Sequence, residues 1–353
     1  MKKELLVATA LVSSLGMAGV AQAVTSSFSG HNKVGVIGKD LDSTSTNTRA
    51  GDQQATFGVS LSETTDGGIK ISTGFDLAEE GGGLDSNGIT LTFTDGSKLD
   101  LIEAGTATGS HVATVPGAGG EQGISATTTN NAPSATTLAA SSNAVGLEWH
   151  TAADAFGVEG LKASISFASN DAALVTTTAQ TASIETTYSA GVTYVTDAGD
   201  TKLTITGGFV NASNNNSATS LENEGIAMGI SAVTGDLTVG AGFGSGNFVT
   251  TPTAGGDLVQ VDGEYTTAGV KYVSGDITFA LGMSAASGKD EAYGITATSK
   301  SDTRDTQSAS IAYAVASGVT ATLGYTDIDD VNEGVALTNT SGSSWYVGAT
   351  VSF

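Results

Sequence analysis

Charged side chains are few in this 353-residue chain, and their spacing suggests interactions with ions in water rather than a chemical reaction. Seven of them occupy polar positions in segments where apolar and polar residues alternate: Lys70, Asp76, Lys98, Asp100, Glu148, Lys162 and Lys202. Residues two apart in a strand share one face of the sheet, so these residues would place fixed charges on its polar face. Glu121 is the one charged residue in a long polar stretch over 106–142.

Support for catalysis is weak. His31, His111 and His150 are the only histidines, and they lie far apart without the spacing of a metal-binding motif. The chain has no cysteine, which excludes thiolate chemistry and disulfides. We find no G-x-S-x-G elbow and no recognisable Ser/His/Asp arrangement. We therefore predict that the protein is not an enzyme and needs no cofactor.

One acidic stretch has the composition of a calcium site. Asp327, Asp329, Asp330 and Glu333 offer alternating carboxylate oxygens, which calcium prefers. The stretch lacks the central glycine and the spacing of an EF-hand loop. Two interpretations remain open: a structural calcium ion on an outer loop, or a solvated loop that binds no metal.

The composition excludes several classes of protein. With 13 basic and 36 acidic residues, the chain lacks the basic face that a nucleic-acid-binding protein needs. At 39% hydrophobic residues it is too apolar for a disordered acidic tail. The N-terminus combines Lys2 and Lys3, an apolar stretch and the sequence Ala21-Gln22-Ala23. This pattern predicts a signal peptide over 1–23 that is removed by cleavage, leaving one domain over 24–353.

Alternation with a period of two dominates the mature chain and predicts an all-β fold with about sixteen strands. Ile277, Phe279, Leu281 and Met283, for example, alternate with small or polar residues. The expected strands span 24–37, 53–63, 67–78, 87–95, 96–105, 143–152, 159–169, 182–196, 200–211, 223–234, 235–247, 258–274, 275–286, 306–317, 318–326 and 343–353. Most are longer than the ~5–6 residues usual in soluble proteins and suit a tilted crossing of a bilayer.

The connections alternate between short and long. Short breaks such as Thr234-Gly235-Asp236 and Ser274-Gly275-Asp276 have the residues of tight hairpins. The long polar breaks span 38–52, 79–87, 106–142, 170–181, 212–222, 248–257, 287–305 and 327–342. Short turns at one end and long loops at the other indicate a closed antiparallel transmembrane β-barrel. The low aromatic content, 6%, keeps open a non-pore structural, surface-layer or adhesin-type β protein of the cell envelope.

The chain resembles Gram-negative general porins, which are sixteen-stranded trimers of the outer membrane. The final strand, Ser344–Phe353, alternates to a terminal phenylalanine, and the outsized loop 106–142 follows the fifth strand. The resemblance implies short periplasmic turns, long extracellular loops and a loop that folds into the lumen and narrows it. It also implies passive diffusion of small hydrophilic solutes, a homotrimer, a surrounding lipopolysaccharide leaflet, and recognition of the Phe353 strand by the barrel-assembly machinery.

Two features bear on how such a pore would work. General porins set clustered arginines against an acidic loop, but this chain has only Arg49 and Arg304, which we place in or near long loops. The seven charged strand residues given above, together with Glu121 and Lys33, would then line the pore. We also expect the loop to pack on the wall through Val112, Val115, Ile124 and Leu138.

The net charge suggests the sign of ion selectivity. Without residues 1–23 the chain has 11 basic and 35 acidic residues, a net charge of −24, which predicts a modest preference for cations. The alternative is that the excess charge sits in screened outer loops. Gly30 and Asn32 give the first strand a weak apolar face, which favours a contact with another subunit there.

Overall fold

The computed structural model describes residues 24–42, 48–78, 84–101, 107–117, 144–170, 184–214, 222–250, 259–290, 300–331 and 340–353. Within them the chain forms sixteen strands. The first eight are β1 (Thr25–Leu41), β2 (Thr48–Thr64), β3 (Lys70–Ala78), β4 (Leu84–Thr92), β5 (Lys98–Leu101), β6 (Ala144–His150), β7 (Leu161–Asn170) and β8 (Ile184–Ala198). The others are β9 (Thr201–Asn214), β10 (Glu222–Thr234), β11 (Leu237–Thr250), β12 (Val259–Ser274), β13 (Ile277–Asp290), β14 (Lys300–Ala316), β15 (Val319–Val331) and β16 (Thr340–Ser352).

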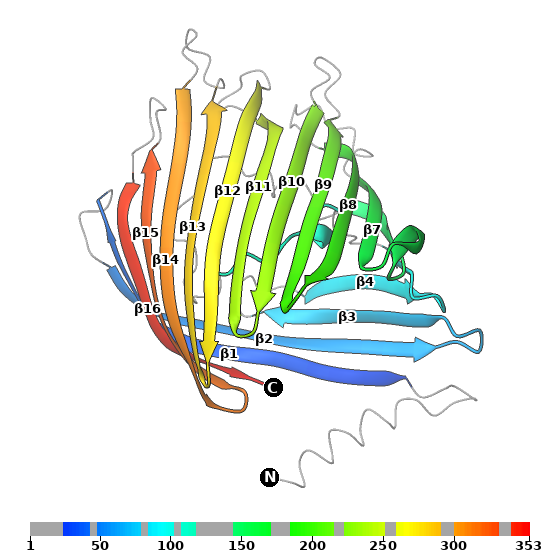
Figure 1. Cartoon of the computed structure of the whole chain (residues 1–353), viewed down its shortest axis with the longest axis horizontal. Coiled ribbons are helices and arrows are strands. Elements are labelled where there is room, and N and C mark those ends of the chain that lie inside the picture. The colour runs from blue at the N-terminus through cyan, green and yellow to red at the C-terminus, as the bar shows by residue number, and fades with distance from the viewer. Residues whose placement is uncertain are drawn as a thin grey trace.

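The strands form one closed antiparallel barrel in which each pairs with its neighbours in sequence and β1 pairs with β16 (Figure 1). This confirms the predicted fold. Two short 3₁₀ turns, η1 (Gly109–His111) and η3 (Ala155–Gly157), lie between strands. No helix in the described parts of the chain is long and apolar enough to span a membrane.

Tight turns connect successive strands at one end of the barrel, which we call the short-turn end. The C-terminus also lies at this end (Figure 1). In three of them a Gly-Asp pair joins successive strands: Gly199-Asp200, Gly235-Asp236 and Gly275-Asp276. The glycines have φ values of 64°, 57° and 59°, as the first central position of a type II′ turn requires. The predicted hairpin turns are confirmed at these positions.

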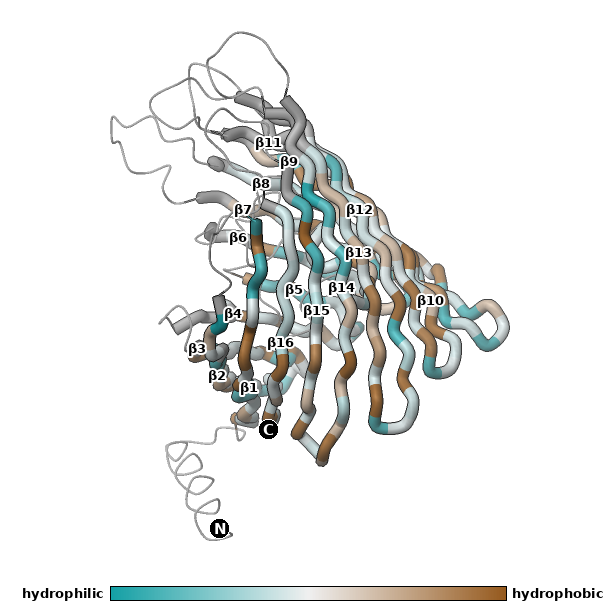
Figure 2. The backbone as a smooth tube through the Cα atoms, turned by 90° about the vertical axis from the view of Figure 1, so that its left-hand side faces the viewer, coloured by the Kyte–Doolittle hydropathy of each residue, from teal (hydrophilic) through white to brown (hydrophobic). Residues whose placement is uncertain are grey.

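The apolar positions of the strands face outward, and the polar positions between them face the lumen. Figure 2 shows hydrophobic and hydrophilic residues alternating along the strands. Large apolar side chains remain exposed on the barrel wall, as with Leu281 at 56% and Met283 at 57%. The aromatic residues are few but concentrated on this face, and several pair across strands. Phe167 and Tyr188, for example, have ring centroids 5.2 Å apart. The sidedness is that of a barrel with hydrocarbon outside and water inside.

Aromatic rings lie on glycines at the β1–β16 seam, where the barrel closes. A Cβ at Gly35 would lie 2.5 Å from the Tyr346 ring inside the barrel. Outside it, a Cβ at Gly38 would lie 2.5 Å from Trp345 Nε1. Phe353 covers Gly30, and the two residues exchange backbone hydrogen bonds of 3.1 Å. Gly30 is therefore explained by the seam itself and is not evidence for a subunit contact.

The strands extend further than expected at the end opposite the short turns. β14 begins at Lys300 and β15 continues to Val331, although 287–305 and 327–342 were expected to be loops. Arg304 is therefore a buried residue on β14, and Asp327 and Asp329 lie on β15. Backbone pairing continues beyond the apolar alternation because each neighbouring strand still offers hydrogen-bond partners. Residues 1–23, the predicted signal peptide, lie outside the described residues.

Adding a methyl group at the seam should destabilise the barrel. A Cβ at Gly348 would overlap the Tyr346 hydroxyl and lie 2.6 Å from the backbone oxygen of Val34. We expect Gly348→Ala to cost ~1–3 kcal/mol, as overpacking does. Gly51→Ala is the matched control, because a Cβ there meets nothing within 4 Å. Thermal unfolding of the barrel in detergent measures the stability of both variants. An equal loss of stability in the two would contradict a specific role for the packing of Tyr346 on Gly348.

Candidate functional site

Residues 107–117 lie inside the barrel, against the inner face of its wall (Figure 1). The Ala107 amide donates to Ser166 Oγ at 3.0 Å, and Thr108 Oγ1 donates to the backbone oxygen of Phe209 at 2.7 Å. At the other end, Ser308 Oγ donates to the backbone oxygen of Gly117. Ser166 and Ser308 alternate with outward-facing apolar residues, so their side chains point into the lumen. The described part of the loop, 107–117, is thus fixed to β7 at its start and to β14 at its last residue.

Between these ends the segment runs over inward-facing glycines, one from each of five consecutive strands. We call Gly191, Gly208, Gly229, Gly240 and Gly269, on β8 to β12, the glycine belt. A Cβ at Gly229 would lie 2.5 Å from the Cβ of Ala113, and one at Gly240 would lie 2.6 Å from the Thr114 oxygen. A Cβ at Gly269 would overlap the Pro116 oxygen. The absence of side chains along the belt lets the loop lie directly on the backbone of the wall.

The residues that face the belt are mostly small, which differs from expectation. Ala107, Ala113 and Pro116 are buried, whereas Val112 is 56% exposed and does not pack on the wall. A methyl of Val115 would lie 3.8 Å from a Cβ at Gly242. Ile124 and Leu138 lie outside the described residues. Inward folding of the loop is confirmed for 107–117, with small residues against the wall, whereas the expected packing of Val112 is wrong.

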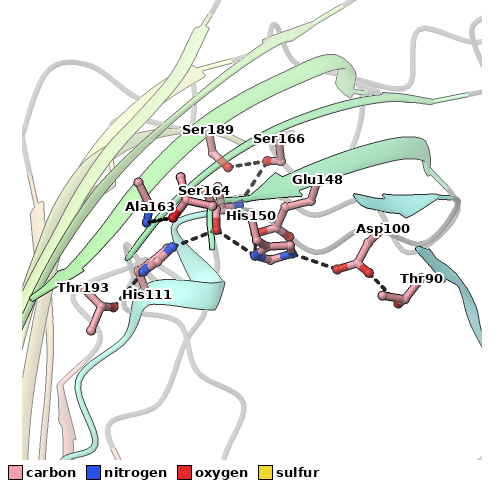
Figure 3. A network of polar contacts seen from close by, with 12 residues as sticks. Thr90, Asp100, His111, Glu148, His150, Ala163, Ser164, Ser166, Ser189 and Thr193 are labelled. Atoms are coloured by element: carbon pink, nitrogen blue, oxygen red, sulfur yellow. Dashed lines mark hydrogen bonds and ion pairs between the residues drawn. The ribbon is translucent and has the colours of Figure 1, made fainter. Parts of the chain in front are cut away.

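A chain of hydrogen bonds ties the start of the loop to the wall (Figure 3). His111 contacts Thr193 Oγ1 through Nδ1 at 2.7 Å and Ser164 Oγ through Nε2 at 2.8 Å. Ser164 Oγ also lies 2.7 Å from His150 Nδ1. His150 Nε2 continues to Asp100 Oδ2 at 2.8 Å, and the other Asp100 oxygen accepts from Thr90. The chain crosses β8, the loop, β7, β6, β5 and β4.

The electrostatics around His111 favour its neutral form. Burial is the main cause that lowers the pKa of His111, and the charges of His150 and Lys162 lower it further. Glu148 lies beside His150, with Oε1 3.7 Å from Nδ1. Its side chain is 2% exposed and that oxygen has no hydrogen-bond partner. Ser110, next to His111 in the loop, is a hydrogen-bond partner of the Glu148 carboxyl.

Ser164, His150 and Asp100 have the order of a nucleophile, a base and an orienting acid, which the sequence did not reveal. Ser164 is only 2% exposed, and its hydroxyl lies between two imidazoles. A substrate carbonyl has no approach to that oxygen in this arrangement. The three residues therefore form part of the loop anchor.

The remaining predicted pore-lining residues face the lumen from two levels. Lys70, Lys98, Lys162 and Lys202 each lie within the first two residues of a strand, next to the short turns. Asp76 lies further along β3, beside Lys33, His31 and Tyr346 in a cavity of about 780 Å³ on the wall near the seam. Lys33 Nζ lies 5.2 Å from the centroid of the Tyr346 ring. Glu121 lies outside the described residues.

The described part of the acidic stretch that begins at Asp327 does not form a metal site. Asp327 and Asp329 lie on the outward face of β15, and Asp329 accepts a hydrogen bond of 2.8 Å from Ser341. Within the described chain, no group of three or more His, Asp or Glu residues is arranged to hold a metal ion. The Asp330 side chain and Glu333 lie outside what the structure describes, so the calcium site stays a prediction.

Sequence reasoning missed the glycine belt and the meeting of His111 with His150. One signal for the belt exists in the strand registers: Gly240, Gly269, Gly282 and Ser308 are directly opposed across β11 to β14. Small residues thus recur at inward positions of neighbouring strands at one level of the wall. The histidine contact has no comparable signal, because it depends on where a loop lies in space.

The closed barrel, its apolar outer face and its inward loop define a transmembrane β-barrel with a narrowed lumen. The model of the Gram-negative porin family matches residues 7–333. The chain belongs to this family and is an integral outer-membrane channel protein.

Solved structures share the fold at low sequence identity. The channel DcaP of Acinetobacter baumannii is 11% identical, with a TM-score of 0.67, over 96% of this chain and 100% of that one. An anion-selective porin from Comamonas acidovorans is 13% identical, with a TM-score of 0.60, over 94% and 100%. OmpT of Vibrio cholerae, in a trimer form, is 12% identical, with a TM-score of 0.61, over 94% and 100%. No curated protein matches the sequence.

Filling the glycine belt should move the loop off the wall. We expect Gly229→Val to push Ala113 inward, lowering single-channel conductance while the barrel stays folded, because the nearest contacts of a Cβ there are loop atoms and the Thr206 hydroxyl. Gly207→Val is the control: a Cβ there meets only a backbone oxygen at 3.9 Å. Bilayer recordings compare the two, and identical conductances would show that the belt does not position the loop.

Proposed function

We propose that the protein is a passive diffusion channel for small hydrophilic solutes and ions. The observation that carries this proposal is that residues 107–117 lie flat on the inner wall. This part of the loop therefore does not extend across the lumen. Thr, Ser, Gly and Lys residues on the inner wall give the lumen a hydrated lining, which suits the passage of hydrophilic solutes. Family membership favours this channel over a non-pore surface-layer or adhesin-type protein.

We propose a homotrimer that buries part of the outer face of β1 and β2. Asn32 and Gln53 lie near mid-strand and point outward, where unpaired amides in hydrocarbon are costly. The amide groups would find partners in a neighbouring subunit. Recognition of the Phe353 strand by the assembly machinery and contact with lipopolysaccharide stay predictions. Phe353 is 67% exposed on the outer face, where a second protein could reach it.

Ion selectivity depends on the side chains that line the lumen rather than on the net charge. The described carboxylates lie mostly in turns, at strand ends or on the outer face, as Asp200, Asp276 and Asp327 do. Seven described lysines face inward: Lys33, Lys39, Lys70, Lys98, Lys162, Lys202 and Lys271. The modest cation preference expected from the net charge of −24 is therefore not supported. We propose that the inward lysines favour anions in the half of the lumen next to the short turns.

Planar-bilayer recording of the mature chain, 24–353, tests the channel directly. We expect ohmic openings that appear in groups of three, because three barrels would insert together. A folded, heat-modifiable protein that gives no openings would contradict the diffusion channel. Single openings from a protein of monomer mass would contradict only the trimer.

Neutralising inward lysines should shift selectivity toward cations. We expect the variant Lys70→Gln/Lys98→Gln/Lys162→Gln to move the reversal potential in a potassium chloride gradient toward that of potassium. Arg49→Gln is the control, because Arg49 is exposed on the outward face of β2. An unchanged reversal potential in the triple variant would show that these lysines do not govern permeation.

A further inference from the structure

The first part of the loop is held by groups that can change their protonation. His111 is the only side chain within 107–117 that titrates near neutral pH, and both of its ring nitrogens have partners on the wall. The groups that face this contact are His150 and Glu148 on β6, Asp100 on β5 and Lys162 on β7. From β8, the residues against His111 are Thr193 and Gly191, which carry no charge.

The chain of hydrogen bonds has one consistent direction when both histidines are neutral. The Asp100 carboxylate only accepts, so His150 Nε2 carries a hydrogen and Nδ1 is an acceptor. Ser164 then donates to His150 Nδ1 and accepts from His111 Nε2. This leaves His111 Nδ1 to accept the hydrogen of Thr193. Every donor and acceptor along this series of hydrogen bonds then has a partner.

One added proton can be accommodated, but a second cannot. If His150 is charged, its Nδ1 donates to Ser164, and the Ser164 hydroxyl turns to donate to His111 Nε2. If His111 is charged as well, both imidazoliums donate to the same buried oxygen, and the Ser164 hydrogen loses its acceptor in the chain. Two positive charges then flank Ser164, with Lys162 nearby. Release of His111 into water removes both penalties.

We propose that His111, Ser164 and His150 form a proton-sensitive latch that positions the pore loop, holding it flat at neutral pH and releasing its start in acid. These are positioning residues, since they act on permeation through the loop. A loop that already lies on the backbone of the wall can only move toward the lumen axis. Release therefore narrows the channel. This consequence rests on the proposed diffusion channel.

The pH dependence has a definite sign. The docked state lowers the pKa of His111, so the released state binds more protons. Docking is favoured above the ordinary histidine value of 6.5 and weakens as the pH falls below it. The conductance should therefore be constant at neutral and alkaline pH and should fall in acid, with a midpoint below 6.5.

The test compares single-channel conductance between about pH 8 and about pH 5, a range that brackets histidine titration. We expect the wild-type conductance to fall in acid and His111→Gln to abolish the fall, because glutamine keeps a donor and an acceptor but does not titrate. His31→Gln is the matched control: it removes the third histidine, which lies in the lumen near the seam. A His111→Gln channel that responds to acid like the wild type would overturn the latch.

A second readout reports the loop without relying on conduction. The chain has no cysteine, so Val112→Cys, at an exposed loop position, accepts one environment-sensitive fluorophore. We expect its emission in detergent to change with the same midpoint, and Ser164→Ala to give the acid-type emission already at neutral pH. Acid-dependent emission from a protein without conductance would contradict only the channel. Conductance with emission and current both insensitive to pH would contradict only the latch.

Discussion

Backbone amides and carbonyls cannot remain unpaired in hydrocarbon, and the pairing of β1 with β16 is where this protein meets that constraint. Fourteen other strands pair with neighbours on both sides through local connections, whereas this seam joins the two ends of the chain. Its packing is correspondingly specific. Phe353 and Trp345 lie on glycines outside the barrel, and Tyr346 lies on glycines inside it. Without this seam there is no continuous wall, and the lumen, the loop and its anchors have no frame.

Glycine serves opposite purposes on the two faces of this wall. At the seam a missing side chain makes room for an aromatic ring, which covers the exposed backbone. Along the glycine belt a missing side chain makes room for another stretch of main chain, so that a loop can lie on the sheet as a second layer. In both places a methyl group would separate surfaces that must touch. Close packing against the backbone of the wall therefore accounts for some of the 48 glycines of the chain.

The sequence predicted those features that depend on a period of two. Alternation identified the sixteen strands and their lipid-facing positions, because each depends only on local geometry. It did not predict the approach of His111 to Ser164, which joins residues 53 positions apart through a loop. The cation preference expected from the net charge is not supported, since net charge counts residues without regard to the face on which they lie. Strand ends were underestimated where polar residues continue the pairing, as in β15.

Two kinds of contact hold the loop, and they respond differently to conditions. From Ala113 to Gly117 the main chain lies against glycines and accepts one hydrogen bond from Ser308, and no titratable side chain takes part. From Ala107 to His111 the loop lies on Gly191 and Gly208 and is also held by hydrogen bonds, of which those of His111 depend on the protonation of its ring. Val112 lies between these parts, in extended conformation and exposed, so it can act as the joint. Because the contacts from Ala113 to Gly117 stay in place, a change of protonation at His111 would move the start of the loop and leave its path over Gly229, Gly240 and Gly269 unchanged.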